Sequence, residues 1–173
     1  RVAARKIKAR LGTVAEDIVR KIYPRLSKRK VKRIISDKEK LEDYSNVKLK
    51  KGTKKGLIYL KSKYDLAIVS NENHQTIVTT LNNLGINPRL FKAIVAYDDV
   101  KKGKPNPEPL KKLEHALKQK IIALIGDTET DIETARAYGT KAIIVMGTVS
   151  HERLMKSKPD AIIKDLSEIS ELI

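Results

Sequence analysis

Residues 121–131 read Ile-Ile-Ala-Leu-Ile-Gly-Asp-Thr-Glu-Thr-Asp, and the rest of the chain is organised around them. The first five residues form a short, isoleucine-rich apolar run that ends at a glycine, which is typical of a buried β-strand. Asp127 follows this predicted strand directly, and Asp131 comes four residues later. The apolar spacing that follows predicts a helix over 129–137, with Gly139 as its stop signal.

These two aspartates are candidates for a magnesium site. Ligands of open α/β sheets bind at the carboxyl ends of the strands, where Asp127 would lie. Mg²⁺ usually takes one or two carboxylates together with substrate oxygens. The stretch alone leaves a structural alternative open, in which Asp127 and Thr128 only cap the helix that follows.

Composition limits the classes of protein to consider. The chain has 173 residues, of which 40% are hydrophobic, and no cysteine. We expect one domain, or one domain with a small insertion, with no disulfide and no thiol chemistry. The lack of cysteine fits a reducing compartment, so we expect a cytoplasmic protein. No apolar run approaches the roughly 18 residues of a membrane span. No histidine–cysteine cluster indicates zinc.

The positive charge is concentrated in the first third of the chain. The net charge is +16, and residues 1–63 hold 22 basic and 6 acidic residues, whereas residues 64–173 hold 15 of each. A basic segment can attract nucleic acid or another polyanion. The alternative is a solvated lysine-rich surface of the kind found in thermophile proteins. Only three tyrosines fall in this third, which leaves few platforms on which bases could stack.

The periodicity predicts a basic helical region followed by an α/β core. Residues 1–46 hold predicted helices at 2–11, 14–23 and 28–44, without a strand signal. From residue 47 the predicted helices lie at 53–63, 74–84, 110–118, 129–137, 151–155 and 166–173, and the strands at 64–69, 93–95, 121–125, 141–145 and 161–163. This alternation predicts a doubly wound parallel sheet in a core of residues 47–173, with helices on both faces.

Polar groups suited to a phosphate follow three of these elements. Ser70 and Asn71 come after the strand at 64–69, and Lys104 lies in a proline-rich loop. A hydroxyl, an ammonium and a cation held by carboxylates together favour phosphate binding. Taken singly, Ser70 and Asn71 could cap a helix, and Lys104 could be a solvated charge. Their order along the chain favours the shared site.

This order resembles the haloacid dehalogenase-like hydrolase superfamily, especially its phosphoglycolate-phosphatase-like members. Residues 65–71 (Asp-Leu-Ala-Ile-Val-Ser-Asn) resemble the second motif, 103–107 (Gly-Lys-Pro-Asn-Pro) the third, and 125–139, which open with Ile-Gly-Asp-Thr-Glu-Thr-Asp, the fourth. The resemblance covers residues 47–173, and more loosely residues 1–46 as a cap domain. It implies a Rossmann-like core with a small helical cap.

The resemblance also implies a role for each candidate residue. Ser70, Asn71 and Lys104 would bind the phosphoryl group, and Lys104 would neutralise it. Asp127 would ligate Mg²⁺, and Asp131 would share or support that role. Catalysis would rest on Lys104, Ser70 and Asp127. The implied enzyme is a Mg²⁺-dependent phosphatase that acts on a small phosphorylated metabolite through an aspartyl-phosphate.

One departure from the family pattern concerns the nucleophile. The family carries it in an Asp-x-Asp-x-[Thr/Val] motif after the first strand, and this sequence has no such motif. Residues 37–39 (Asp-Lys-Glu) do not qualify, because no buried strand precedes them. We expect the strand and its motif upstream of Arg1, and the chain alone to be inactive. The alternatives are a strand supplied by another chain, or an inactive homologue whose basic third binds RNA or another polyanion.

Overall fold

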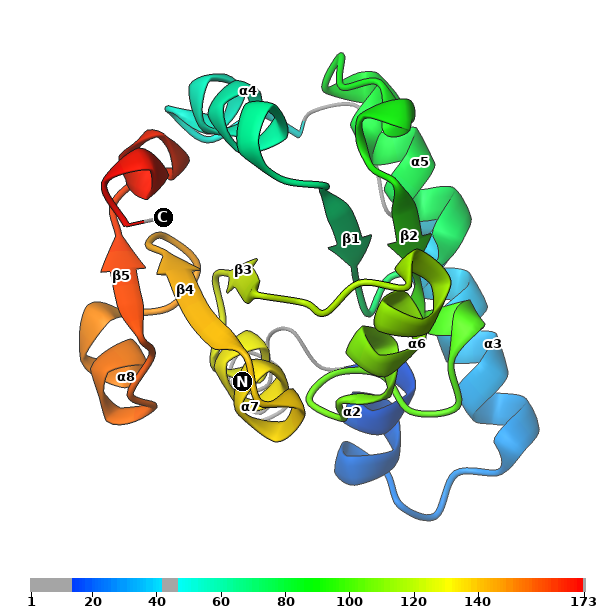
Figure 1. Ribbon diagram of the computed structural model, residues 1–173. Helices are drawn as coiled ribbons and strands as arrows, with labels where there is room; N and C mark the ends of the chain where they lie inside the picture. The colour runs from blue at the N-terminus through cyan, green and yellow to red at the C-terminus, as the bar shows by residue number, and fades with distance from the viewer. Residues whose placement is uncertain (1–13, 42–46, 173) are drawn as a thin grey trace.

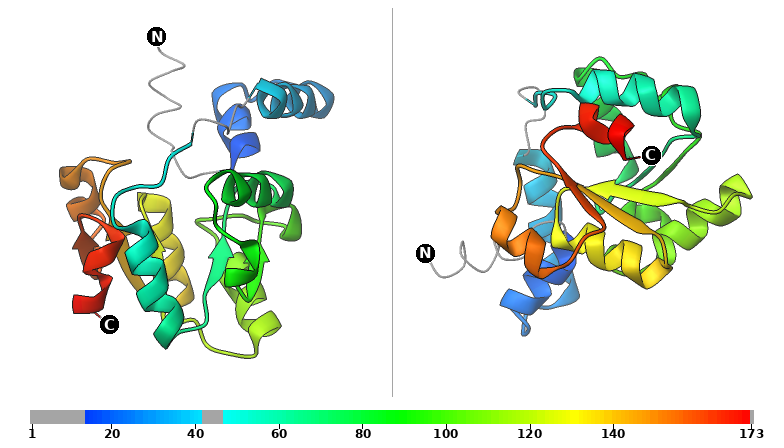
Figure 2. Two further views of the ribbon diagram at one scale, coloured as in Figure 1. Left: turned by 90° about the horizontal axis from the view of Figure 1, so that it is seen from above. Right: turned by 60° about the vertical axis from the view of Figure 1, so that its left-hand side comes forward.

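The computed structural model describes residues 14–41 and 47–172 (Figure 1). Two of the predicted basic helices are present, α2 (Ala15–Ile22) and α3 (Lys28–Leu41). They pack against each other, with Val31 fully buried, and they lie together at one end of the molecule (Figure 2). The predicted helix at 2–11 and the end of the one at 28–44 lie outside the described residues.

The remaining elements alternate as the sequence predicts, and the α/β fold class is confirmed. In chain order they are α4 (Thr53–Lys63), β1 (Ala67–Val69), α5 (His74–Asn83), η1 (Pro88–Leu90), β2 (Ala93–Val95), η2 (Tyr97–Asp99), α6 (Glu108–Leu117), β3 (Ala123–Gly126), α7 (Glu129–Tyr138), β4 (Lys141–Val145), α8 (His151–Lys156), β5 (Ala161–Ile163) and η3 (Leu166–Glu171), where η marks a 3₁₀ helix.

Helices cover both faces of the larger sheet. Ile132 and Leu154, from α7 and α8, pack on one face together with Ile144 of β4. On the other face, Leu60 of α4 and Ile169 of η3 pack together in a second cluster. Side chains alternate between the two faces along a strand, so β4 contributes to both clusters and holds the two layers together.

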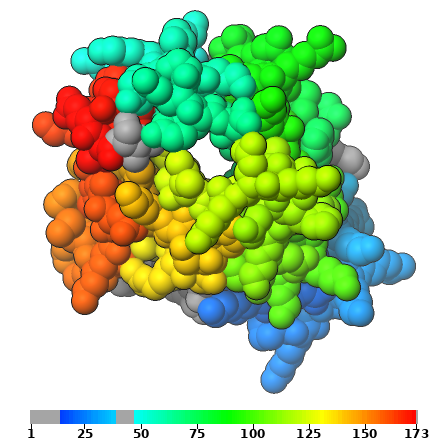
Figure 3. All heavy atoms as spheres, in the orientation of Figure 1, coloured from blue at the N-terminus to red at the C-terminus, as the bar shows by residue number. Residues whose placement is uncertain are grey.

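The strands form two separate parallel sheets. β1 pairs with β2, and β3, β4 and β5 pair in that order. Within residues 14–41 and 47–172, no strand joins β1 to β3. A cavity of about 740 Å³ lies between these two strands, and Figure 3 shows it as an opening near the centre of the molecule.

Two elements differ clearly from the prediction, and smaller shifts of up to two residues occur at others, such as the starts of β3 and α6. The strand predicted at 64–69 begins only at Ala67, because the Tyr64 N–H still bonds to the Leu60 carbonyl at the end of α4 and pairing with β2 starts at Ala67. The C-terminal helix is a 3₁₀ helix rather than an α-helix. The Asp165 side chain accepts a hydrogen bond from the Ser167 N–H at 2.8 Å, which favours a tight turn at its start.

Candidate active site

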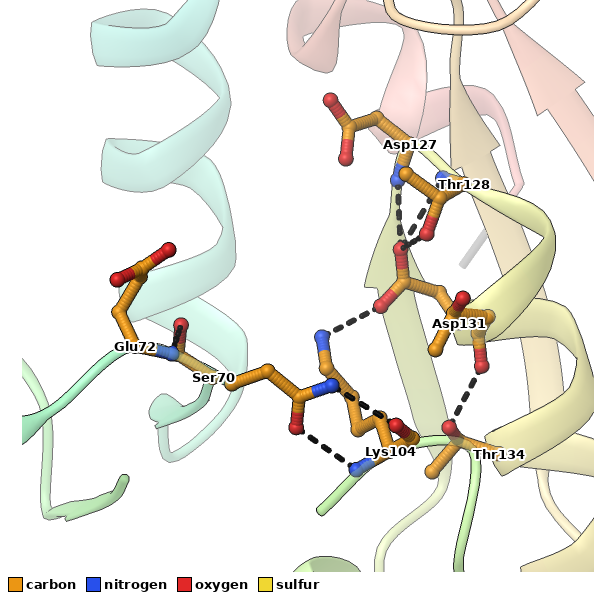
Figure 4. A network of polar contacts seen from close by, with 9 residues as sticks. Ser70, Glu72, Lys104, Asp127, Thr128, Asp131 and Thr134 are labelled. Atoms are coloured by element: carbon orange, nitrogen blue, oxygen red, sulfur yellow. Dashed lines mark hydrogen bonds and ion pairs between the residues drawn. The ribbon is translucent and has the colours of Figure 1, made fainter. Parts of the chain in front are cut away.

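The predicted site residues lie where β1 and β3 end (Figure 4). Ser70 and Asn71 follow β1, and Asp127 follows β3. Lys104 reaches the same place from the loop between η2 and α6. Figure 4 shows its ammonium directed at Asp131, in the first turn of α7. The structure therefore brings residues from three distant parts of the chain together.

Lys104 and Asp131 form a buried ion pair. The Lys104 Nζ lies 2.6 Å from the Asp131 Oδ1, and the two side chains are only 12% and 5% exposed. The second oxygen, Oδ2, accepts hydrogen bonds from the Asp127 N–H (3.1 Å), the Thr128 N–H (3.1 Å) and the Thr128 hydroxyl (2.7 Å). Buried charges are stable only when paired and hydrogen-bonded, and this carboxylate meets both conditions.

These contacts decide the ionisation of Asp131. Burial alone would raise the pKa of this carboxyl. The Lys104 charge and the hydrogen bonds from Lys104, Thr128 and Asp127 outweigh burial, so the pKa lies below its ordinary value of 3.8. Asp131 is therefore ionised at neutral pH, and it holds the Lys104 ammonium in one place.

Asn71 fixes the backbone of Lys104. Its Nδ2 donates to the Lys104 carbonyl at 2.8 Å, and its Oδ1 accepts from the Lys104 N–H at 2.8 Å. A Cβ on Gly103 would lie 2.4 Å from that Oδ1, so only glycine fits beside this clamp. The lysine is thus held at its backbone by the end of β1 and at its ammonium by α7.

Asp127 has a more open environment than Asp131. Its side chain is 40% exposed, and its Oδ2 contacts the Lys50 Nζ at 3.3 Å and accepts a hydrogen bond from the Thr148 hydroxyl. Figure 4 shows its carboxylate turned away from that of Asp131. A half-exposed carboxylate fits Mg²⁺, which takes few protein ligands and keeps water or substrate oxygens. Asp131, with both oxygens already bonded, fits a supporting role.

A family model described as haloacid dehalogenase-like hydrolase matches residues 1–145. The chain belongs to this haloacid dehalogenase-like hydrolase family. Within the family it is similar to pyrophosphatase PpaX of Halalkalibacterium halodurans, with 31% identity over 113 residues, 64% of this chain and 52% of that protein. PpaX of Bacillus pumilus is 32% identical over 115 residues, 64% of this chain and 52% of that protein. The chain spans about half the length of these curated relatives.

Solved structures support the fold of this haloacid dehalogenase-like chain. A putative haloacid dehalogenase-like hydrolase from Bacteroides fragilis superposes with a TM-score of 0.83 at 24% identity, covering 95% of this chain and 81% of that one. A predicted phosphoglycolate phosphatase from Haemophilus somnus gives 0.75 at 22%, with 96% and 80% covered. At such identities the likeness shows the shared fold alone.

Several residues of this candidate site were missed in the sequence. A Cβ on Gly126 would lie 2.3 Å from the Asp131 Cγ, so the glycine before Asp127 is required by packing. Its place between strand and aspartate was a usable signal. Lys50 and Thr148 gave no signal, because only the fold brings them to Asp127 from distant segments.

Ser70 and the histidines complete the account of the candidate residues in the described part of this haloacid dehalogenase-like chain. Ser70 accepts a hydrogen bond from the Glu72 N–H at 3.1 Å. The three histidines, His74, His115 and His151, are exposed. No group of three or more metal-binding side chains occurs in the described part of the chain. No helix there is long and apolar enough to cross a membrane.

Proposed function

We propose that this chain provides the phosphate-binding and cation-binding part of a Mg²⁺-dependent phosphatase for small phosphorylated metabolites. The observation that carries the proposal is the buried Lys104–Asp131 pair at the edge where β1 and β3 end. A lysine held at both its backbone and its ammonium is a preorganised cation. Such a group stabilises phosphoryl charge without first having to reorganise.

Each side chain has a distinct part in this proposal. Lys104 neutralises the phosphoryl group, and Asp131 and Asn71 position Lys104. The Ser70 hydroxyl accepts from Glu72, which leaves its own proton to donate to a phosphate oxygen. Asp127 would hold Mg²⁺, which, when bound, would offset charge on a phosphoryl oxygen.

The nucleophile of the proposed reaction lies outside these residues. By family resemblance it is an aspartate at the end of a strand, and it forms an aspartyl-phosphate that water then hydrolyses. The cavity between β1 and β3 has a place for such a strand, next to Ser70 and Asp127. We therefore expect the 173-residue chain alone to bind phosphate and cation without turning over substrate.

Inorganic pyrophosphate is the first substrate we propose to test. Two similar proteins carry the name pyrophosphatase. The strong positive charge of residues 1–63 would concentrate a multiply charged anion near the site. Family membership favours this enzymatic function over a polyanion-binding module.

The test is phosphate release by protein expressed together with any coding sequence that precedes residue 1. Pyrophosphate and phosphoglycolate are assayed with and without Mg²⁺. Lys104→Ala should lower kcat by about 10²–10³-fold, the usual loss for one preorganised charge-stabilising group. Lys102→Ala in the same loop is the matched control and should leave kcat unchanged. Near-normal turnover by the Lys104 variant would overturn the proposal.

A further inference from the structure

Lys50 contacts Asp127, and the proposed function gives this lysine no task. Its Nζ lies 3.3 Å from the Asp127 Oδ2, and its side chain is 48% exposed. The Thr148 hydroxyl donates to the same oxygen. In the described part of the chain, no hydrogen bond or ion pair reaches the other oxygen, Oδ1. A cation held at Oδ1 would therefore have the Lys50 ammonium beside it, on the same carboxylate.

The backbone of Lys50 is fixed, whereas its ammonium is exposed. The Lys50 carbonyl accepts hydrogen bonds from the Thr53 hydroxyl at 2.8 Å and from the Thr53 N–H at 3.3 Å, at the start of α4. The side chain then crosses Gly147, whose φ of +135° favours glycine. A Cβ on Gly147 would lie 3.3 Å from the Lys50 Nζ. Lys50 is thus a long arm on a fixed base, and its end can turn toward solvent.

Two ammoniums reach this site, and they contact carboxylates that point apart. Lys104 pairs with Asp131, and both side chains are buried. Lys50 pairs with Asp127, whose carboxylate is turned away from that of Asp131 (Figure 4). A buried ion pair keeps its partners, whereas an exposed pair contributes little and exchanges readily with other ions. Lys50 is therefore the ammonium that can change its partner.

Lys50 and a metal ion would share the carboxylate of Asp127. Like charges close together repel, so Lys50 should weaken the binding of Mg²⁺ alone. An anionic group beside the cation offsets this repulsion, because it attracts both positive charges. In the proposed function, Lys104 already neutralises the phosphoryl group. The charge of Lys50 is therefore matched by an anionic group beyond that phosphoryl group.

We propose that Lys50 is a specificity-determining residue that binds a second anionic group of the substrate. When substrate and cation are bound, its ammonium leaves the Asp127 Oδ2 and pairs with that group. The substrate class is then a phosphorylated compound with a second phosphate or a carboxylate close to the phosphoryl group. This inference rests on the proposed function for the phosphoryl group and the cation, and it adds the subsite beside them.

A purely structural role explains Lys50 less well. The Thr53 hydrogen bonds hold the turn before α4 through the Lys50 carbonyl, so they form with any side chain at residue 50. The exposed ion pair itself adds little to the free energy of unfolding. The side chain of Lys50 therefore contributes mainly positive charge at the edge of the site, where a ligand can reach it.

Isothermal titration calorimetry with the full 173-residue chain at saturating Mg²⁺ tests the proposal. Methylenediphosphonate carries two phosphoryl groups, phosphonoacetate one phosphoryl group and one carboxylate, and methylphosphonate a single phosphoryl group. Lys50→Ala should lower the ratio of the affinities for methylenediphosphonate and methylphosphonate about five- to tenfold, as expected for one partly exposed contact between charges. The ratio for phosphonoacetate and methylphosphonate tells whether a carboxylate is also accepted.

Two further variants separate a contact from a general loss of positive charge. Lys48→Ala removes an equal charge from an exposed lysine two residues earlier, and Lys50→Arg keeps the charge at residue 50. Both should keep the affinity ratios within about twofold in roughly 0.15 M salt, which screens charges that make no contact. Circular dichroism checks that all variants fold. Equal ratios in Lys50→Ala and in Lys48→Ala would overturn the proposal.

The same titrations keep this proposal distinct from the proposed function. Binding of all three probes without an effect of Lys50→Ala on the ratios overturns the second subsite and leaves the proposed function standing. If none of the probes binds, the proposed phosphate site is overturned, and the subsite with it. In protein with phosphatase activity, Lys50→Ala should raise KM for pyrophosphate relative to p-nitrophenyl phosphate, whereas Lys104→Ala should lower kcat for both.

Discussion

Two lysine–aspartate pairs lie at the same edge of the molecule, and they differ in almost every physical respect. Lys104 and Asp131 are buried and 2.6 Å apart, and Asp131 is bonded at both oxygens. Lys50 and Asp127 are 48% and 40% exposed and 3.3 Å apart. The first pair is built like a fixed part of the core, the second like a contact that solvent or an ion can replace.

The difference in burial indicates which aspartate can exchange its lysine partner for water or an ion. Removing one member of a buried pair leaves an uncompensated charge, whereas an exposed pair is screened by water and contributes little. The family pattern places both aspartates in one motif, but their contacts differ, and we propose separate tasks for them. Asp131 orients Lys104, and Asp127 remains accessible to a cation.

The largest expected effect is the loss of stability when the buried pair is broken. Asp131→Ala should lower the free energy of unfolding by about 3–5 kcal/mol, because Lys104 is left buried without a partner. Asp127→Ala should change it by less than about 1 kcal/mol. Urea denaturation followed by circular dichroism measures both values. Equal losses in the two variants would show that the buried pair contributes no more to the free energy of unfolding than the exposed pair does.

A second expected effect is a pH dependence of the stability that the buried pair contributes. The pKa of Asp131 is lowered in the folded state, so its contribution to stability is present above the ordinary carboxyl pKa of 3.8 and is lost as the pH falls through the folded value. The stability difference between the parent and Asp131→Asn should therefore shrink below about pH 4. Thermal unfolding from pH 7 to pH 3 measures it. A difference that grows on acidification would contradict the sign of the shift.

The smallest expected effect concerns the exposed pair and the cation. Lys50→Ala removes a positive charge 3.3 Å from the Asp127 Oδ2, so Mg²⁺ should bind about two- to fivefold more tightly. Lys48→Ala, two residues earlier in the chain, is the control and should have little effect on Mg²⁺ binding. Isothermal titration calorimetry of Mg²⁺ into the chain gives the affinities. Weaker binding by the Lys50 variant would mean that the lysine helps to hold the metal site together.

The sequence predicted the elements better than the contacts between them. The run at 121–125 and the glycine after it placed β3 and Asp127 correctly, because a buried strand carries a strong local signal. The Asn71 clamp and the Lys50 contact had none, since they join segments 33 and 77 residues apart. The late start of β1 and the 3₁₀ form of η3 were also missed, because they depend on the end of α4 at Tyr64 and on the turn at Asp165.

The unpaired edge of β1 also affects how fast its backbone amides exchange with solvent. The N–H groups of Ile68 and Ser70 face β2, whereas those of Ala67 and Val69 face the cavity between β1 and β3. Neighbouring residues of one short strand should therefore differ in hydrogen–deuterium exchange, with slow and fast amides alternating along it. Amide exchange measured by NMR would show this alternation.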